Sequence, residues 1–265
     1  MKPKQISVGE TFVNVIDVGS GPVILLVHGF PLDHQMWKFQ IEGLSDGYRI
    51  IAPDLPGFGS SPASQTELSM RGLADTLVAM LDSMGVAEPV AYCGLSMGGY
   101  IGWQFWKHHR QRLSRLVACD TKAADDTEEI HRARQIAAHS VMQTGAATVA
   151  DSMLQKLFHD PDSERKQTIT QGVHQVISQT SPATIAAGQL AMADRPDATG
   201  WISEIEIPTL FVVGEFDGIT TPEQMRANAD LVPGSKFLQV ADAGHMAPLE
   251  NHVEFNAGLV EFLGK

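Results

Sequence analysis

The sequence predicts an α/β fold with a mostly parallel sheet that is covered by helices on both faces. Short β-branched segments alternate along the chain with longer segments of helical periodicity, which is typical of parallel sheets. Several of these short segments lack polar alternation, as strands buried on both faces do. Residues 121–199 contain helical patterns only and interrupt this alternation. We therefore expect a core made of residues 1–120 and 200–265 with an all-helical insertion between its two parts.

The expected strands are short runs rich in Val, Ile and Leu, and the first two are close enough in sequence to form an antiparallel edge. They cover residues 12–18, 23–27, 48–52, 89–93, 113–119, 209–213 and 236–240. Apolar residues at helical spacing predict helices in both parts of the chain. In the core these helices cover residues 70–84, 99–109, 222–231 and 248–263. In the insertion they cover residues 127–143, 146–158, 163–178 and 182–193. Pro222 and Pro248 suit first-turn positions, where the missing N–H would have no helical partner.

Composition excludes several classes of partner. The chain of 265 residues carries a net charge of −12, and its Lys and Arg residues form only short clusters, so nucleic acid and anionic membrane are not expected partners. The N-terminal residues lack the apolar stretch of a signal peptide, and no apolar run is long enough to span a membrane, so we expect a cytoplasmic protein. Cys93 and Cys119 lie in strand-like segments and predict buried free thiols without metal-ligand spacing. Neither a metal nor a cofactor is expected, and the oligomeric state stays open.

The glycine-rich segment Gly94-Leu95-Ser96-Met97-Gly98 lies between a strand-like run and a helical one. Glycine weakens both kinds of element, so its abundance here needs a local reason. A serine on a sharp strand-to-helix turn presents its hydroxyl at the carboxyl edge of the sheet, and flanking glycines let the neighbouring backbone pass close by. The helix N-terminus behind the serine favours developing negative charge. The segment predicts Ser96 as a nucleophile; a loop that serves only the turn is the alternative.

A serine nucleophile needs a histidine base that is held by a carboxylate, and in this architecture the chain order is serine, acid, histidine. His245 follows the last strand-like run and Asp217 follows the one before it, so both are expected at the carboxyl edge. His28 also follows a strand, but it precedes the serine, and we expect it to brace its own loop. Asp120, which follows another strand, is a rival for the role of the acid. Glu215 and Asp242 are expected to shape turns instead.

Two backbone N–H groups are expected to bind the oxyanion of the reaction. One belongs to Met97, directly after the nucleophile. The other comes from the loop His28-Gly29-Phe30-Pro31, where Phe30 has an N–H and Pro31 has none. A simple tight turn is the alternative for this loop. The side chains of Phe30, Pro31, Met97 and Met246 predict an apolar substrate pocket suited to small acyl groups.

Taken together, these segments resemble the α/β-hydrolase superfamily over the whole chain. The segments that carry the resemblance, in the family's order, are residues 28–31, 54–61, 94–99, 214–217 and 244–245. The resemblance implies the α/β-hydrolase fold: a mostly parallel eight-stranded sheet with helices on both faces, and residues 121–199 as a helical cap over the catalytic edge. We interpret segment 54–61 as structural, shaping a loop near the pocket.

A finer resemblance concerns the nucleophile. Serine rather than aspartate at position 96 is unlike haloalkane dehalogenases and epoxide hydrolases, whereas Ser96 followed by Met97-Gly98-Gly99 resembles carboxylesterases, cofactor-free haloperoxidases and 3-oxoadipate enol-lactonases. This implies a serine hydrolase that cleaves a small carboxylic ester through an acyl-enzyme, with Ser96, His245 and Asp217 as the triad. Proline at position 31 goes with perhydrolysis in the haloperoxidases, which implies a perhydrolase side activity.

Two other functions remain open at this point. One is a lactonase for a dicarboxylate enol-lactone, which would need cations facing the pocket. The insertion offers Lys122, Arg132, Arg134, Lys156, Arg165, Lys166 and Arg195. The other is a ligand receptor that keeps the triad without rapid turnover. The expected partner is in each case a small molecule, an ester or a lactone for the enzymes.

Overall fold

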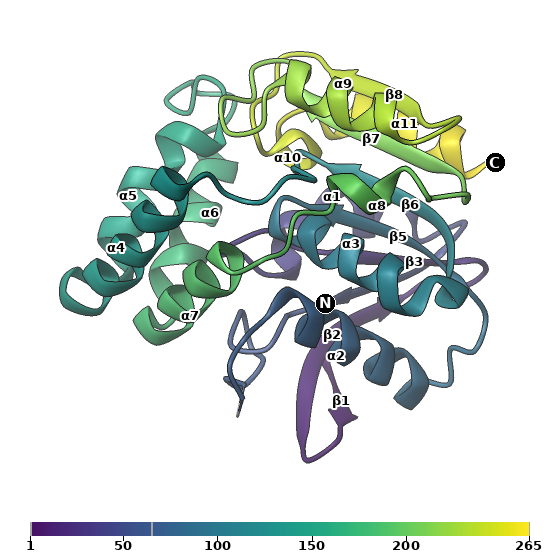
Figure 1. Ribbon diagram of the computed structural model, residues 1–265, viewed down its shortest axis with the longest axis horizontal. Coiled ribbons are helices and arrows are strands. Elements are labelled where there is room, and N and C mark those ends of the chain that lie inside the picture. The colour runs from purple at the N-terminus through teal and green to yellow at the C-terminus, as the bar shows by residue number, and fades with distance from the viewer. Residues whose placement is uncertain (1, 65, 265) are drawn as a thin grey trace.

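The computed structural model describes residues 2–64 and 66–264 of the chain. An eight-stranded sheet with the order β1-β2-β4-β3-β5-β6-β7-β8 runs through its centre (Figure 1). The strands are β1 Lys4–Val8, β2 Thr11–Val18, β3 Val23–Val27, β4 Arg49–Pro53, β5 Val90–Leu95, β6 Leu113–Cys119, β7 Thr209–Gly214 and β8 Lys236–Val240. The pairs β1–β2 and β2–β4 are antiparallel, and all other pairs are parallel. The predicted class, with a mostly parallel eight-stranded sheet, is confirmed.

One predicted pairing is wrong. The first two predicted strands, β2 and β3, do not pair; β2 pairs with β1 and β4, and β3 lies between β4 and β5. The sequence Val-Ile-Leu-Leu-Val of β3 is almost entirely buried, and a strand without a polar face belongs in the middle of a sheet rather than at its edge. The edge strand β1 escaped prediction because none of its side chains is fully buried, so it carries no apolar run.

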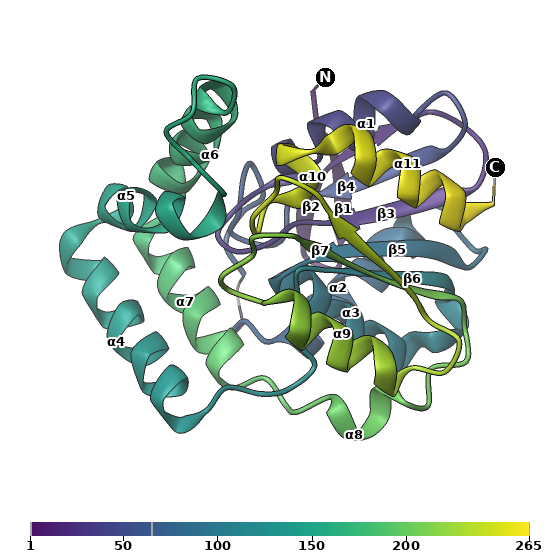
Figure 2. The ribbon, with the colours of Figure 1, turned by 90° about the horizontal axis from the view of Figure 1, so that it is seen from above.

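Helices cover both faces of the sheet (Figure 2). One face carries α1 Lys38–Leu44, α10 Ala247–Glu250 and α11 His252–Leu263; the other carries α2 Met70–Ser83, α3 Met97–His109, α8 Thr199–Ile202 and α9 Pro222–Leu231. Two short 3₁₀ helices, η1 His34–Trp37 and η2 Arg110–Arg112, complete the core. Pro222 and Pro248 lie in first turns, as predicted. The predicted helix 248–263 is two helices, because the backbone of Asn251 leaves the helical region with φ −133° and ψ 64°.

Between β6 and β7 the chain forms a helical layer beside the sheet (Figures 1 and 2). Its helices are α4 Glu128–Thr144, α5 Ala146–Leu157, α6 Gln167–Gln179 and α7 Pro182–Ala193. We call residues 121–199 the helical insertion. The helix predicted at 163–178 begins only at Gln167, because the preceding residues form a turn in which the N–H of Lys166 donates to the Ser163 carbonyl at 2.9 Å.

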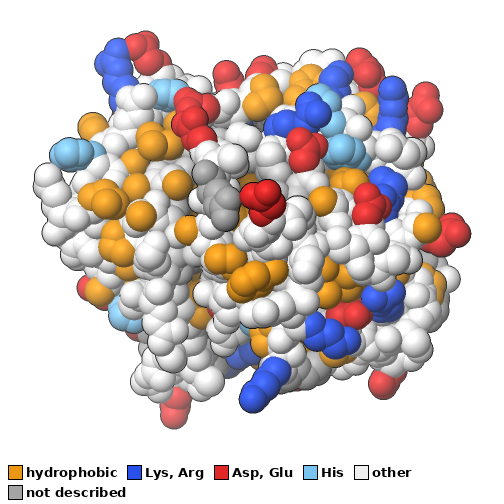
Figure 3. All heavy atoms as spheres, turned by 90° about the horizontal axis from the view of Figure 1, so that it is seen from below, with side chains coloured by type: hydrophobic (Ala, Val, Ile, Leu, Met, Phe, Trp, Pro, Cys, Tyr) orange, Lys and Arg blue, Asp and Glu red, His pale blue; other side chains and the backbone are white. Residues whose placement is uncertain are grey.

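The surface mixes charges of both signs on the face shown in Figure 3, where Lys and Arg side chains lie among Asp and Glu side chains. Exposed large apolar side chains occur on the helical insertion at Ile130, Ile136, Met142 and Leu190. Across residues 2–64 and 66–264, the search for a helix with the length and apolar character of a membrane span finds none.

Candidate active site

Ser96 lies on a strained turn between β5 and α3. Its φ of 54° and ψ of −112° fall in a region that non-glycine residues rarely occupy, at a cost of about 1–3 kcal/mol. The backbone around it is held firmly, because its N–H donates to the Cys119 carbonyl at 2.9 Å and its carbonyl accepts the Thr121 hydroxyl at 2.8 Å. Gly98 is needed here because a Cβ on it would overlap the carbonyl oxygen of Val27. The glycines thus let the strand-to-helix turn close on itself, as the sequence predicts.

His245 and Asp217 form a buried hydrogen-bonded pair. The loop after β8 carries His245 and the turn after β7 carries Asp217, and His245 Nδ1 lies 2.8 Å from Asp217 Oδ2. The other oxygen of Asp217, Oδ1, accepts the N–H groups of Ile219 at 2.8 Å and Thr220 at 3.1 Å. Burial raises the pKa of Asp217, but the charge and hydrogen bond of His245 and these two N–H groups outweigh burial and leave the pKa below its usual value. The carboxylate can therefore orient the imidazole while it stays ionised.

Asp120, the predicted rival for the role of the acid, lies next to this pair, but its surroundings shift its pKa in the opposite direction. One oxygen of Asp120, one of Asp217 and one nitrogen of His245 lie within 4.8 Å of one another. Asp120 Oδ1 accepts the N–H of Gly214 at 2.8 Å, whereas its buried Oδ2 has no hydrogen-bond partner among the described residues. Burial and the neighbouring charge of Asp217 raise the pKa of Asp120 well above its usual value. Asp120 therefore favours its protonated form more than an ordinary carboxyl does, and its Oδ1 braces the end of β7.

The structure leaves the Ser96 hydroxyl without a hydrogen bond in the described part of the chain, so no such bond joins it to His245. Hydrogen bonds of this kind are commonly long in ligand-free enzymes and shorten when the substrate is bound. The serine, the acid and the histidine follow the parallel strands β5, β7 and β8 at the carboxyl edge of the sheet, and Asp217 fixes the orientation of the imidazole.

The two expected oxyanion donors belong to buried residues, one at a helix start and one in a loop. Met97 is the first residue of α3, and Phe30 follows β3, the strand next to β5. Within the described residues, no hydrogen bond uses the N–H of Phe30 or of Met97, so both donors remain available. The peptide bond between Phe30 and Pro31 is cis.

The predicted bracing role of His28 has a structural counterpart. The fully buried ring donates from Nδ1 to the Gly29 carbonyl at 2.8 Å and accepts the N–H of Leu55 on Nε2 at 3.0 Å. It thereby ties the Phe30 loop to the segment 54–61. Burial lowers the pKa of His28, which keeps the ring neutral in this role.

The segment 54–61 is held by the carboxylate of Asp54. Its oxygens accept the N–H of His34 at 3.0 Å, the His34 ring at 2.6 Å and the N–H of Ser60 at 2.9 Å. These bonds shape the loop from within, in agreement with the structural interpretation. Asp33, His34 and Asp54 also have spacing that could hold a metal ion, as do Asp120, Asp217 and His245. In both groups, however, a ring nitrogen of the histidine is hydrogen-bonded to the carboxylate of an aspartate in the same group.

The predicted pocket residues adjoin the helical insertion. The ring of Phe30 lies under α7, because a Cβ on Gly188 would be 2.7 Å from it. The Pro31 carbonyl lies 3.5 Å from the Thr180 hydroxyl at the end of α6, and the N–H of Met246 donates to the Leu157 carbonyl at 3.1 Å. Met97 and Met246 are fully buried. Insertion and site loops are therefore in direct contact.

Sequence reasoning missed Glu250 altogether and considered Lys166 only as a cation for a ligand. Both side chains are buried, and Lys166 Nζ lies 2.8 Å from Glu250 Oε2. The only signal in the sequence is an acid that follows His245 by a few positions, and such an acid is common at the start of a helix.

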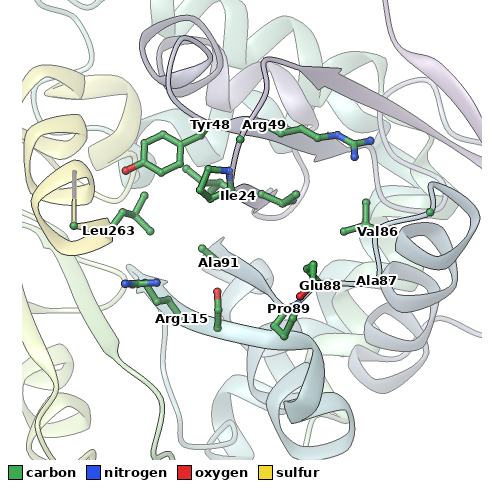
Figure 4. Close-up of a pocket in the computed structure, with 16 residues that line it drawn as sticks. Ile24, Tyr48, Arg49, Val86, Ala87, Glu88, Pro89, Ala91, Arg115 and Leu263 are labelled. Atoms are coloured by element: carbon green, nitrogen blue, oxygen red, sulfur yellow. The ribbon is translucent and has the colours of Figure 1, made fainter.

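A cavity of about 640 Å³ lies at the opposite, amino edge of the sheet (Figure 4). Residues from the starts of β3, β4, β5 and β6 line it, among them Ile24, Arg49, Ala91 and Arg115. None of the predicted site residues borders this cavity. This cavity therefore lies apart from the candidate active site at the carboxyl edge.

Comparison with known proteins places the chain in a family. The model of the alpha/beta hydrolase fold family matches residues 22–252. A thermophilic esterase from Thermogutta terrifontis, solved with malate bound, superposes with a TM-score of 0.94 at 36% identity, over 99% of this chain and 98% of that one. The enol-lactonase from Burkholderia xenovorans LB400 superposes with a TM-score of 0.91 at 26% identity, over 99% of this chain and 100% of that one.

A sequence relative agrees with these structural matches. The 3-oxoadipate enol-lactonase 1 of Acinetobacter baylyi is 25% identical over 236 residues, which cover 89% of this chain and 86% of that protein. Since the family model spans most of the sequence, the chain belongs to the α/β-hydrolase family. It is a hydrolase of that fold.

Proposed function

We propose that this hydrolase cleaves small carboxylic esters through an acyl-enzyme. The buried hydrogen bond of 2.8 Å between His245 Nδ1 and Asp217 Oδ2 carries the proposal, because it leaves Nε2 as the nitrogen that accepts a proton. Ser96 supplies a nucleophile on a strained turn at the same edge of the sheet. The esterase from Thermogutta terrifontis, with 36% identity over nearly the whole chain, supports the same chemistry.

In the proposed reaction, Ser96 Oγ attacks the ester carbonyl carbon while its proton passes to His245 Nε2. The N–H groups of Phe30 and Met97 bind the oxyanion that forms. When the carbon–oxygen bond to the leaving group breaks, His245 returns the proton and an alcohol departs. Water, activated by the same imidazole, then attacks the acyl group, which leaves as the acid and restores the serine.

The pocket for the acyl group lies between the site loops and the helical insertion. The side chains of Phe30, Pro31, Met97 and Met246 line it in this proposal, and residues 121–199 act as its cap. Contacts of α7 with Phe30, and of Leu157 with Met246, support this arrangement. An apolar pocket of this kind suits short acyl chains.

Covalent labelling tests the proposal. A serine-directed phosphonate should add to Ser96 alone, as peptide mapping by mass spectrometry would show. Ser96→Ala should lower kcat for p-nitrophenyl acetate by about a millionfold, because a triad serine acts as a unit with its base. Labelling of another residue, or near-normal turnover in the alanine variant, would contradict the mechanism. Tight ester binding with intact labelling but negligible turnover would point to a ligand receptor instead.

Hydrolysis of an enol-lactone that carries a free carboxylate is the second candidate, and Lys122 favours it. Lys122 is half-buried in the segment that follows β6, after Asp120 and Thr121, and among the described residues no acid forms an ion pair with its ammonium. Burial and the nearby charge of Arg195 lower its pKa. The remaining cations of the insertion are paired, except for the exposed Lys156; the pairs are Arg132–Glu128, Arg134–Asp126, Arg195–Asp126, Arg165–Asp242 and Lys166–Glu250.

A matched pair of lysine variants tests this candidate. Lys122→Met should raise KM for the carboxylate-bearing lactone by about tenfold or more, because a charge-assisted hydrogen bond contributes about 1.5–3 kcal/mol. The same variant should leave KM for p-nitrophenyl acetate unchanged, and Lys156→Met should affect neither substrate. Equal KM values for the lactone in the parent and Lys122→Met would remove Lys122 as its binding partner.

Perhydrolysis is proposed as a side activity of the same site. Pro31 restricts the conformation of Phe30, whose carbonyl accepts no hydrogen bond in the described chain and could receive one from incoming hydrogen peroxide. One such bond, of about 1 kcal/mol, shifts the competition between peroxide and water about fivefold. Pro31→Leu should therefore lower the peracid-to-acid product ratio from acetate esters by about this factor at equal peroxide. An unchanged ratio in a folded, esterase-active variant would exclude Pro31 from choosing the nucleophile.

A further inference from the structure

The loop that carries His245 is held on both sides of the histidine, by Glu250 of α10 before it and by the helical insertion after it. Before it, the N–H of Gly244 donates to Glu250 Oε1 at 2.7 Å. After it, the N–H of Met246 donates to the carbonyl of Leu157, the last residue of α5, at 3.1 Å. His245 therefore lies between two residues whose N–H groups are fixed by hydrogen bonds. The bond of Met246 reaches the insertion directly, and the bond of Gly244 reaches Glu250, which in turn contacts the insertion.

Glu250 links this loop to the segment that follows α5. Its Oε1 holds Gly244, and its Oε2 accepts the N–H of His159 at 2.9 Å and the ammonium of Lys166 at 2.8 Å. Lys166 also donates to the carbonyl of His159 and, at 3.3 Å, to the carbonyl of Asp242. One carboxylate and one ammonium thus connect residues 157–166 of the insertion with the start and the middle of the loop 241–246.

This contact is buried and tightly packed. The side chain of Lys166 is 2% exposed and that of Glu250 is 0% exposed. A Cβ on Gly244 would lie 2.7 Å from the His159 nitrogen and 3.2 Å from Glu250 Oε1, so the loop has no space to move toward the insertion. Burial raises the pKa of Glu250, and the Lys166 ammonium and the two N–H groups oppose that shift.

A buried ion pair contributes little net stability compared with apolar residues of the same volume, so stability alone does not account for this one. Its geometry suits a positioning role, since four of its hydrogen bonds end on the backbone of the loop 241–246 or of the segment 157–166 that contacts this loop. Asp217 fixes the rotation of the imidazole, but the backbone of the loop decides where the ring lies relative to Ser96.

We propose that Lys166 and Glu250 are positioning residues for His245, through which the helical insertion sets the place of the imidazole. This inference rests on the proposed function, in which His245 is the base. In that role a displacement of about 1 Å is enough to reduce the rate about a hundredfold. The insertion would then act as a fixed support for the catalytic loop at residues 157–166, in addition to covering the pocket.

The test compares amide replacements of two buried acids that both face the insertion's cations. Glu250→Gln keeps the size of the side chain and removes its charge beside Lys166. The control is Asp126→Asn, whose carboxylate is 4% exposed and pairs with Arg134 at 2.6 Å and Arg195 at 2.7 Å. None of the hydrogen bonds of Asp126 reaches the loop 241–246 in the described chain. A third protein, Lys166→Met/Glu250→Gln, removes both charges together and leaves no unpaired ion.

With p-nitrophenyl acetate, Glu250→Gln and the double variant should lose about 10- to 100-fold in kcat, while KM stays within about twofold. The rate of phosphonate labelling at Ser96 should fall in the same proportion, because it also depends on the base. Asp126→Asn should keep kcat and the labelling rate within about twofold, even where its Tm falls as much as that of Glu250→Gln.

Three results would overturn the inference. One is an unchanged kcat in folded Glu250→Gln and in the double variant. Another is an equal kcat loss in Asp126→Asn, which would indicate general loosening of the insertion. The third is a loss that appears in KM alone. Failure of the proposed function would look different, since the parent itself would then not be labelled at Ser96, and the inference would fall with it.

Discussion

Asp120 and Asp217 follow the neighbouring parallel strands β6 and β7, and both carboxyls lie close to His245 at the carboxyl edge of the sheet. Asp217 receives hydrogen bonds on both oxygens, from the imidazole on one and from two backbone N–H groups on the other. Asp120 receives a single N–H, from Gly214, and its second oxygen has no hydrogen-bond partner among the described residues. Burial raises the pKa of both carboxyls, but the charge of His245 and the hydrogen bonds to Asp217 outweigh burial there, whereas the charge of Asp217 raises the pKa of Asp120 further.

The difference shows how two acids in one buried site come to favour different protonation states. Ionising both carboxyls costs free energy because their like charges repel, and the carboxyl with the nearby positive charge and more hydrogen-bond donors ionises more readily. Asp217 therefore favours its ionised form and can orient a base, whereas Asp120 favours its protonated form and accepts a hydrogen bond from Gly214. Asp120 thereby supports the backbone from which the Asp217 turn begins.

The largest effect that separates the two acids should be on turnover. Asp217→Asn should lower kcat by about 10⁴-fold, because an amide cannot stabilise the required tautomer and the imidazolium. The measurement is steady-state hydrolysis of p-nitrophenyl acetate by each variant, with folding checked by circular dichroism.

Two matched replacements are the controls for that loss. Asp120→Asn should reduce kcat by less than about tenfold, since an amide resembles the protonated carboxyl that burial and the neighbouring charge of Asp217 favour. Glu215→Gln should have a smaller effect still, because Glu215 Oε2 only accepts the N–H of Asp242 at 3.1 Å in an exposed position. A 10⁴-fold loss in Asp120→Asn with a mild one in Asp217→Asn would reverse the assignment of the acid.

The same comparison predicts pH dependences of stability that differ between the two variants. Folding raises the pKa of Asp120. Its contribution to the free energy of unfolding is therefore fully present below about pH 4, the usual pKa of an unfolded Asp, and is lost as pH rises through the pKa of the folded state. The pKa of Asp217 is lowered, so its contribution is present above about pH 4 and is lost as pH falls through the folded value.

Urea unfolding at pH 5, 6 and 7 reads out both effects. Relative to the parent, the free energy of unfolding of Asp120→Asn should increase by about 1.4 kcal/mol per pH unit in this window, up to the folded pKa of Asp120. The difference between the parent and Asp217→Asn should stay constant over the same window. A constant difference for Asp120→Asn would show that Asp120 is ionised in the folded protein.

Much of the fold could be predicted because its signals are local. The run Val-Ile-Leu-Leu-Val predicts a buried strand, and proline at position 222 predicts the first turn of a helix, from a few residues each. Strand β1 gave no such signal, since pairing with β2 rather than burial holds it in the sheet. The break at Asn251 was missed for the opposite reason, because the apolar pattern continues across it without interruption.

The order of residue types along the chain already shows which of them follow which strands: a serine follows one strand, an acid another and a histidine the last. A parallel sheet brings the ends of these strands to one edge. Which of the two aspartates favours the ionised form depends on the folded arrangement, because distant segments supply the burial, the charge of His245 and the N–H donors. The pairing of Lys166 with Glu250 was likewise invisible in the sequence, since 84 positions separate the two residues and nothing local links them. Periodicity and turn chemistry are properties of neighbours in the chain, whereas protonation and positioning are properties of neighbours in space.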